Sequence, residues 1–145
     1  MKLIIFVAIK KNHIMKKHLL IIALLMSNLM LNAQSVGDES IIDYGNYSLR
    51  FKITNINPNE CEVYKDDIQS YVTSITIPSS AVIGGNEYTV TSIGENAFAW
   101  QFYLTTILFE SDSQLVIIEE RAFNQCHELI NFEIPNSVAH IGKNA

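Results

Sequence analysis

A nine-residue pattern that recurs in the second half of the chain limits its fold more than any other feature. Residues Val90–Phe98 read Val-x-x-Ile-Gly-x-x-Ala-Phe, and the same apolar and small positions return in Leu115–Phe123 and begin again in Val138–Ala145. Ala97 and Ala122 are 25 residues apart, and the next step, to Ala145, is 23. One such unit cannot bury its own apolar edge, whereas stacked units share a continuous core. The repeat therefore predicts a solenoid.

A second pattern keeps the same spacing. Leu104–Phe109 and Leu129–Ile134 both read apolar-x-x-apolar-x-apolar, and Val72–Ile77 is an earlier copy. Alternation with a period of two is typical of a strand, and Pro78 and Pro135 are expected to end their strands because proline lacks the amide that a ladder needs. Each unit of 23–25 residues is thus predicted to hold a strand and a short helical turn.

The helical turn is expected over Gly94–Phe98, which is long enough for about one turn. Gly94 and Gly142 are expected to permit a sharp bend, since glycine has the widest backbone freedom. Another turn is predicted at Gly84–Asn86, inside an insertion between Ile77 and Val90.

The segment before the repeats has a different pattern. Within Asp43–Ile53, alternate residues from Tyr47 onward are apolar and share one face of a strand. Asn57–Asn59 is a strong turn signal, and Cys61–Tyr64 returns as a second strand. A β-hairpin is predicted here.

These patterns together resemble the BspA-type leucine-rich repeat, a family of bacterial surface and secreted proteins. The resemblance covers residues 72–145, with Gln101 standing where Cys126 sits in the next unit and Glu119 in place of the glycine. It implies a mainly β leucine-rich-repeat solenoid with a β-rich N-terminal cap at residues 34–71. It also implies a protein ligand, such as the host extracellular matrix or another bacterial surface protein.

The N-terminus has the pattern of a secretory signal peptide. Basic residues at Met15–His18 precede an apolar run, Leu19–Leu31, which is shorter than the roughly 20 residues of a membrane-spanning helix. We expect residues 1–33 to be the signal, cut between Ala33 and Gln34. Met15 is interpreted as the true start, the alternative being a long n-region. We expect no membrane span in the mature chain, which is secreted or displayed at the cell surface.

At its other end, the chain stops one residue before the Phe expected in the third repeat. An uncapped stack exposes apolar surface and unpaired strand groups. We therefore interpret the chain as a truncated piece of a longer protein or a broken gene.

Charge argues against two classes of partner. All fifteen Asp and Glu lie after residue 33, together with only five of the ten Lys and Arg, which gives that region a net charge of −10. Nucleic acid requires a basic surface, and anionic lipid attracts one, so we expect neither partner. Cys61 and Cys126 are too few for a disulfide framework, and either form one bridge or remain free.

Motifs that carry chemistry are missing from the predicted mature sequence. No nucleophile elbow, P-loop or zinc motif occurs. Cys126–His127 could serve as metal ligands, but a structural zinc site needs four, so a surface turn is favoured. Asp66–Asp67 and Glu119–Glu120 could act in acid–base or calcium chemistry, but solvated acidic pairs are far commoner. No enzyme activity, cofactor or metal is predicted.

Two candidate contact surfaces remain. An aromatic cluster at Trp100, Phe102 and Tyr103 occupies a turn that is polar in the next unit, which indicates an exposed contact patch. The alternative is that the insertion Ala81–Tyr88 folds over it.

The second surface is the outward face of the predicted strands, with a mere solvated face as the alternative. Its nine residues are Thr73, Ser74, Thr76, Thr105, Thr106, Leu108, Ile130, Asn131 and Glu133.

From these features, we predict a protein-binding or adhesion module. The alternatives are a structural spacer, a non-functional remnant of a longer surface protein, and an enzyme whose catalytic residues lie downstream.

Overall fold

The computed structural model describes residues 34–145, which form one compact unit. The predicted signal peptide, start site and the residues before the cleavage point lie outside the described residues. Within the described chain the structure has strands and turns but no helix. The strands are β1 (Glu39–Asp43), β2 (Tyr47–Ile56), β3 (Asn59–Ile68), β4 (Ser74–Ile77), β5 (Ser80–Ile83), β6 (Asn86–Ile93), β7 (Thr106–Phe109), β8 (Ile117–Ile118), β9 (Asn131–Phe132) and β10 (His140–Ile141).

The predicted hairpin is formed by β2 and β3, which pair antiparallel. Leu49, Phe51 and Ile53 alternate along β2 and are fully buried, as the period-two pattern predicts. β3 then pairs in parallel with β6, so the hairpin shares its core with the repeats. The boundary between cap and repeats at residue 72 stays a prediction.

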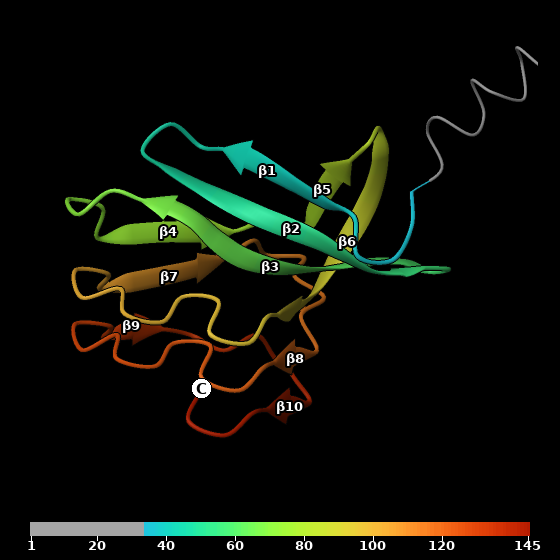
Figure 1. Ribbon diagram of the computed structural model, residues 1–145. Coiled ribbons are helices and arrows are strands. Elements are labelled where there is room, and N and C mark those ends of the chain that lie inside the picture. The colour runs from blue at the N-terminus through green and yellow to red at the C-terminus, as the bar shows by residue number, and fades with distance from the viewer. Residues whose placement is uncertain (1–33) are drawn as a thin grey trace, which may run out of the picture. The chain divides into compact units, whose positions relative to one another are not determined.

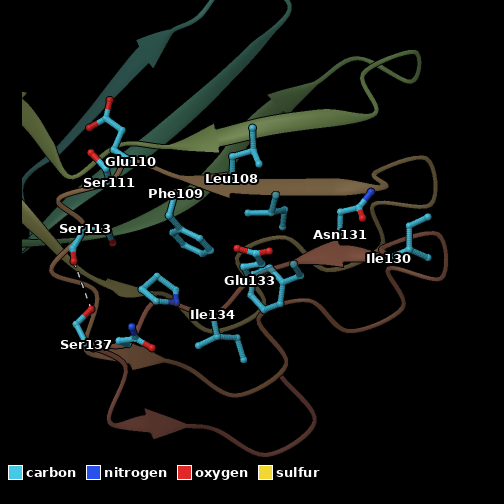
Figure 2. Close-up of a pocket in the computed structure, with 14 residues that line it drawn as sticks. Leu108, Phe109, Glu110, Ser111, Ser113, Ile130, Asn131, Glu133, Ile134 and Ser137 are labelled. Carbon is cyan, nitrogen blue, oxygen red and sulfur yellow. Dashed lines mark hydrogen bonds between the residues drawn. The ribbon is translucent and has the colours of Figure 1, made fainter.

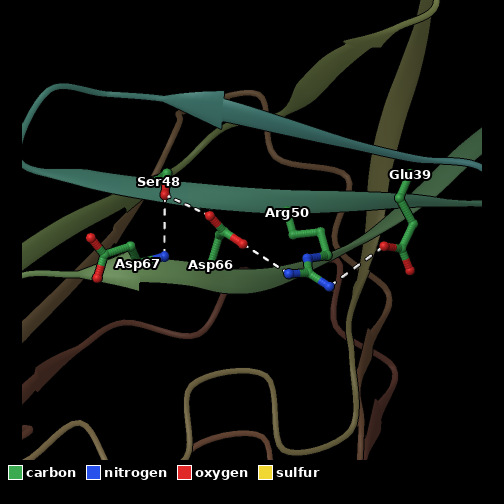
Figure 3. A network of polar contacts seen from close by, with 5 residues as sticks. All are labelled: Glu39, Ser48, Arg50, Asp66 and Asp67. Atoms are coloured by element: carbon green, nitrogen blue, oxygen red, sulfur yellow. Dashed lines mark hydrogen bonds and ion pairs between the residues drawn. The ribbon is translucent and has the colours of Figure 1, made fainter.

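The outer side of the hairpin carries a polar network that links three strands (Figure 3). Arg50 on β2 bonds Asp66 on β3 at 2.8 Å and lies 3.6 Å from Glu39 on β1. Asp66 also accepts a hydrogen bond from Ser48 at 3.1 Å. The bond from Arg50 lowers the pKa of Asp66 from its ordinary value, against an opposing effect of desolvation.

After the hairpin the chain winds into a solenoid whose coils pair in parallel (Figure 1). On one side β4, β7 and β9 form a three-stranded sheet, and on the other β6, β8 and β10 continue the sheet of β3. Ile75, Ile107 and Phe132 occupy one rung of the smaller sheet. The prediction of a mainly β repeat solenoid is confirmed.

The expected helical turn is wrong in detail, because Gly94–Trp100 forms successive β-turns. The N–H of Ala97 donates to the Gly94 carbonyl and that of Ala99 to the Asn96 carbonyl, three residues back in each case. Asn96 and Trp100 have left-handed φ of 54° and 65°, a conformation that cannot continue a right-handed helix.

These turns bond to the next coil instead of to themselves. The N–H groups of Asn96, Phe98 and Trp100 donate to the carbonyls of Glu120, Ala122 and Asn124, at 2.7–3.1 Å. Because alternate amides point along the stack, the turn acts as a third ladder between the two sheets.

The role expected of Gly94 and Gly142 is also wrong. Neither has a positive φ, and Glu119 occupies the equivalent position between them. A Cβ on Gly94 would overlap the Tyr64 ring, and one on Gly142 would come within 2.7 Å of the backbone carbon of Glu119. Glycine fits here because neighbouring groups approach closely, and not because these positions need a positive φ.

The predicted turn at Gly84–Asn86 is present and joins β5 to β6. Gly84 and Gly85 have φ of 57° and 89°, as a two-residue hairpin loop of type I′ requires. The Gln34 side chain donates to the Gly84 carbonyl at 3.2 Å and also bonds the Asn86 side chain. The insertion is therefore held at the N-terminal segment.

The core lies between the two sheets and the turns. Phe98 and Phe123 stack with their ring centroids 5.5 Å apart, and Leu104, Ile107 and Leu115 surround them with almost no exposed surface. Apolar residues of successive coils thus meet in rows, which is why a single coil could not fold alone.

Candidate protein-binding surface

The nine predicted strand-face residues come together as three rows across β4, β7 and β9. In one row the pairing aligns Ser74, Thr106 and Asn131, and the Asn131 amide donates to the Thr106 hydroxyl at 3.3 Å. A second row begins with Thr76 beside Leu108 and continues, at the same spacing, to Glu133. In the third, the N–H of Thr105 donates to the Thr73 carbonyl and that of Ile130 to the Thr105 carbonyl.

This strand face is mixed in character. Its hydroxyl-rich residues are exposed or half-buried, and Leu108 and Ile130 expose 52% and 78% of their surface. Ile130 is the most exposed large apolar side chain among the described residues. Large apolar side chains that remain exposed to solvent are available for contact with a partner.

A groove opens at one end of this face (Figure 2). In the first pair of coils the N–H of Glu110 donates to the Ile77 carbonyl at 3.2 Å, but the equivalent residue in the next coil is Pro135, which has no N–H. β9 pairs with β7 only at Asn131 and Phe132, and the segments that follow line a cavity of about 730 Å³. Its lining includes Leu108, Ile130, Asn131 and Glu133 of the strand face, with Phe109, Glu110 and Ile134.

Sequence reasoning missed this groove, although Pro135 and the longer link at Glu110–Gln114 were both visible. The Ser137 hydroxyl donates a hydrogen bond to the carbonyl of Ser113, a residue of that link, at 3.4 Å, as Figure 2 shows. Pro135 was interpreted only as the end of a strand. Because proline has no N–H, it also cannot donate a backbone hydrogen bond to the neighbouring strand β7.

The aromatic cluster is exposed. Trp100, Phe102 and Tyr103 expose 58%, 48% and 61% of their surface. Trp100 meets Phe102 edge to face with centroids 6.0 Å apart, and Phe102 stacks on His127 of the next coil at 6.2 Å. The alternative, that the insertion covers them, is wrong, because that segment forms β5 and the β5–β6 turn, held against Gln34.

A fourth aromatic residue, Tyr71, belongs with this cluster. One turn bond recurs in three coils: from Val72 N–H to the Gln69 carbonyl, from Leu104 to Gln101 and from Leu129 to Cys126. The residue before each donor therefore has the same place in its coil, which aligns Tyr71, Tyr103 and Glu128. Tyr71 exposes 71% of its surface.

We call Tyr71, Trp100, Phe102 and Tyr103 the aromatic patch. It adjoins the strand face, because Thr73 and Thr105 follow the two tyrosines by two residues in their coils. An alignment of Gln69–Ile75 with Gln101–Ile107 places Tyr71 opposite Tyr103, so the sequence alone could have indicated that Tyr71 belongs to the patch.

Other candidate residues lie elsewhere. Cys61 and Cys126 are free thiols; Cys61 is buried, and Cys126 donates to the Phe98 carbonyl at 3.1 Å. Burial raises the pKa of Cys61 to about 12 and raises that of Cys126 as well. Within residues 34–145, no three His, Cys, Asp or Glu side chains gather where they could hold a metal ion.

The two acidic pairs also have ordinary partners. Asp66 bonds Arg50, as described, while Asp67 is exposed and accepts a hydrogen bond from Gln69 at 2.6 Å. Glu120 pairs with the neighbouring Arg121 at 3.1 Å. In the described part of the chain there is also no helix with the length and apolarity that spanning a membrane demands.

Parallel coils, rows of buried apolar residues and a small sheet with an exposed face define a repeat protein of the leucine-rich class. The chain matches the BspA type leucine-rich repeat region over residues 68–145, in six copies, and belongs to that family.

Two solved structures are similar to this chain. The pneumococcal vaccine antigen PcpA is 24% identical with a TM-score of 0.46, over 75% of this chain and 35% of its own. A leucine-rich cell surface protein from Faecalibacterium prausnitzii A2-165 is 20% identical with a TM-score of 0.47, over 72% of this chain and 33% of its own. The chain thus spans about a third of each. Among curated proteins, none matches it significantly.

Proposed function

We propose that this chain is a secreted or cell-surface module that binds other proteins and performs no catalysis. The observation that carries the proposal is the continuity of the aromatic patch with the strand face. Four exposed aromatic side chains and two exposed aliphatic ones, Leu108 and Ile130, adjoin rows of hydroxyl and amide groups. Aromatic anchors beside adaptable polar groups are typical of protein interfaces.

The sequence pattern and the family support the proposed export and the proposed class of partner. The predicted signal peptide, cut between Ala33 and Gln34, would deliver the chain to the cell exterior. There the expected ligand is a host extracellular-matrix protein or another bacterial surface protein. The acidic charge of residues 34–145 makes nucleic acid an unsuitable partner.

Binding to immobilised extracellular-matrix proteins and to whole bacterial cells tests the proposal. Replacing Trp100 with Ser is expected to weaken binding about 10- to 30-fold, as for a central aromatic anchor. Val82→Ser is the matched control, because Val82 exposes 57% of its surface on β5, outside both surfaces.

Two outcomes would overturn the proposal. If Trp100→Ser lowers stability without changing affinity, the aromatic patch serves the fold and not a partner. If the wild-type protein binds neither class of target, a spacer role explains the repeats better.

A further inference from the structure

We propose that the partner is recognised through a Lys- or Arg-rich segment, which lies across the aromatic patch between flanking carboxylates. This inference rests on the proposed function and names the chemistry of the ligand. It depends on the alignment of three successive coils and on the distribution of charge around the patch.

Acidic residues surround the aromatic patch. The three coils form this surface with residues 67–76, 100–108 and 125–133, which contain Asp67, Glu128 and Glu133 but no Lys or Arg. All three carboxylates are exposed, and none belongs to an ion pair among the described residues. Glu128 continues the row of Tyr71 and Tyr103, so a carboxylate ends a line of aromatic rings.

The nearby basic groups are engaged or lie at another corner of the coil. The Lys65 ammonium donates to the Ala99 carbonyl at 2.8 Å and is only half-exposed. Arg121 and Lys143 belong to the opening turns of their coils, matching Asn96 and Glu95, well before the aromatic positions. A cation from outside would therefore find this surface without a competing Lys or Arg from residues 34–145.

Aromatic faces attract cations through the negative potential above the ring, most strongly for indole and next for phenol. The patch holds one indole and two phenol rings, each more than half exposed. Rings at equivalent places in neighbouring coils follow the strand spacing of about 4.8 Å, so an extended basic segment could use several together. Flanking carboxylates add charge-assisted hydrogen bonds to guanidinium or ammonium groups.

A neutral glycan could also stack on exposed rings, but it would not require the one-signed charge around them. The net charge of −10 over residues 34–145 further favours the approach of a cationic segment. The observations therefore favour a basic peptide, and glycan binding becomes an outcome of the test.

The chain supplies its own probe, because Trp100 is its only tryptophan. We would titrate the purified protein with an eight-residue peptide of alternating arginine and glycine and follow tryptophan fluorescence. The same peptide with citrulline in place of arginine has nearly the same shape without the charge, and a neutral oligosaccharide tests stacking alone. We expect saturable quenching by the arginine peptide only, weakening as salt rises from about 10 to 150 mM because exposed charges are screened.

Variants that keep Trp100 then locate the site. Tyr103→Leu and Glu128→Gln are each expected to weaken binding about 2- to 5-fold, the effect of one exposed cation–π or ionic contact. Asp112→Asn is the matched control for Glu128→Gln, since it also replaces an exposed carboxylate with an amide, but beside Pro58 and Thr89 and outside the patch, and it should not alter the affinity.

Equal binding of the citrulline peptide or of the oligosaccharide would overturn the inference. So would an Asp112→Asn effect as large as that of Glu128→Gln, because net charge alone would then explain the binding. If the arginine peptide fails to bind while Trp100→Ser still weakens capture by a protein target, this inference fails and the proposed function stands. If the peptide binds at the patch but Trp100→Ser leaves capture unchanged, the proposed function fails instead.

Discussion

Phe98 and Phe123 stack on one another in adjacent coils, yet their removal should have different costs. In Phe98→Ala, loss of a fully buried ring removes roughly 2 kcal/mol of transfer free energy. The closed cavity of roughly 100 Å³ adds about 2.4 kcal/mol at 24 cal/mol per Å³. We expect the free energy of unfolding to fall by about 4 kcal/mol.

Phe123 differs because it already lines an apolar cavity of about 340 Å³ with Ile118, Phe132 and Ile141. Phe123→Ala would enlarge that open space and create no closed void, so the cavity cost is absent and the transfer part is about 2 kcal/mol. The stacking between Phe98 and Phe123 is lost in both variants, but Phe123→Ala also loses the edge-to-face contact with Phe132 at 4.8 Å, about 1 kcal/mol more, which brings its cost to about 3 kcal/mol.

Urea unfolding followed by far-UV circular dichroism measures both costs, since Trp100 is exposed and would report poorly. With a slope of about 1–1.5 kcal/mol per M, the difference of about 1 kcal/mol should separate the two midpoints by roughly 0.7–1 M. Equal costs would refute the reasoning, because they would mean that Phe123 is enclosed as fully as Phe98. A smaller slope in Phe123→Ala alone would indicate that the last coil opens separately.

Three further changes test individual features of the fold. Gly142→Ala should destabilise the protein by about 1–3 kcal/mol in urea unfolding, because its methyl group would overlap the backbone of the preceding coil; a loss below about 0.5 kcal/mol would contradict this. Arg121→Asn should raise the free energy of unfolding by up to about 1 kcal/mol, since Asn tolerates the left-handed φ of 55° that Asn96 adopts in the equivalent turn; an unchanged or lower melting temperature would count against it. Burial raises the pKa of the Cys61 thiol from 9.0 to about 12, so the neutral thiol contributes its full stability below pH 9, and this contribution is lost as the pH rises toward 12. The free energy of unfolding of Cys61→Ala should therefore fall less steeply above pH 9 than that of the wild type. An equal slope of unfolding free energy against pH would exclude this cause.

Inward-facing strand positions were predictable from sequence because packing imposes a period of two. The predicted strand face contains only outward residues, and by the same alternation Ile75 and Ile107 face inward, where both are buried. Outward positions such as Thr76 and Leu108 followed automatically, because a strand that buries one face must expose the other. The fold and the strand face could therefore be derived without coordinates.

The turns were not predictable in the same way. A left-handed φ is common for Gly and Asn, but the structure places it at Trp100, Arg121 and Gln125, which carry no such preference. Bonds to the neighbouring coil hold these residues there, and such bonds depend on the register of the stack. Tyr71 was missed for a related reason, since its place in the patch depends on a turn bond shared with two later coils.

The repeat itself suggests the cleanest test of what the aromatic patch does. At the places of Trp100, Phe102 and Tyr103 the next coil carries Gln125, His127 and Glu128, on the same backbone turn. A triple variant that copies those polar residues into the earlier coil should therefore keep the fold, with an unfolding free energy within about 1 kcal/mol of the wild type.

If the patch is a binding surface, the triple variant should lose affinity for protein targets while its circular dichroism spectrum and urea midpoint stay nearly unchanged. A large loss of stability would instead show that the rings pack against something the fold requires. If the same turn accepts Gln, His and Glu without loss of stability, the aromatic side chains are not needed for folding, and we would then attribute their exposure to the proposed binding of a partner.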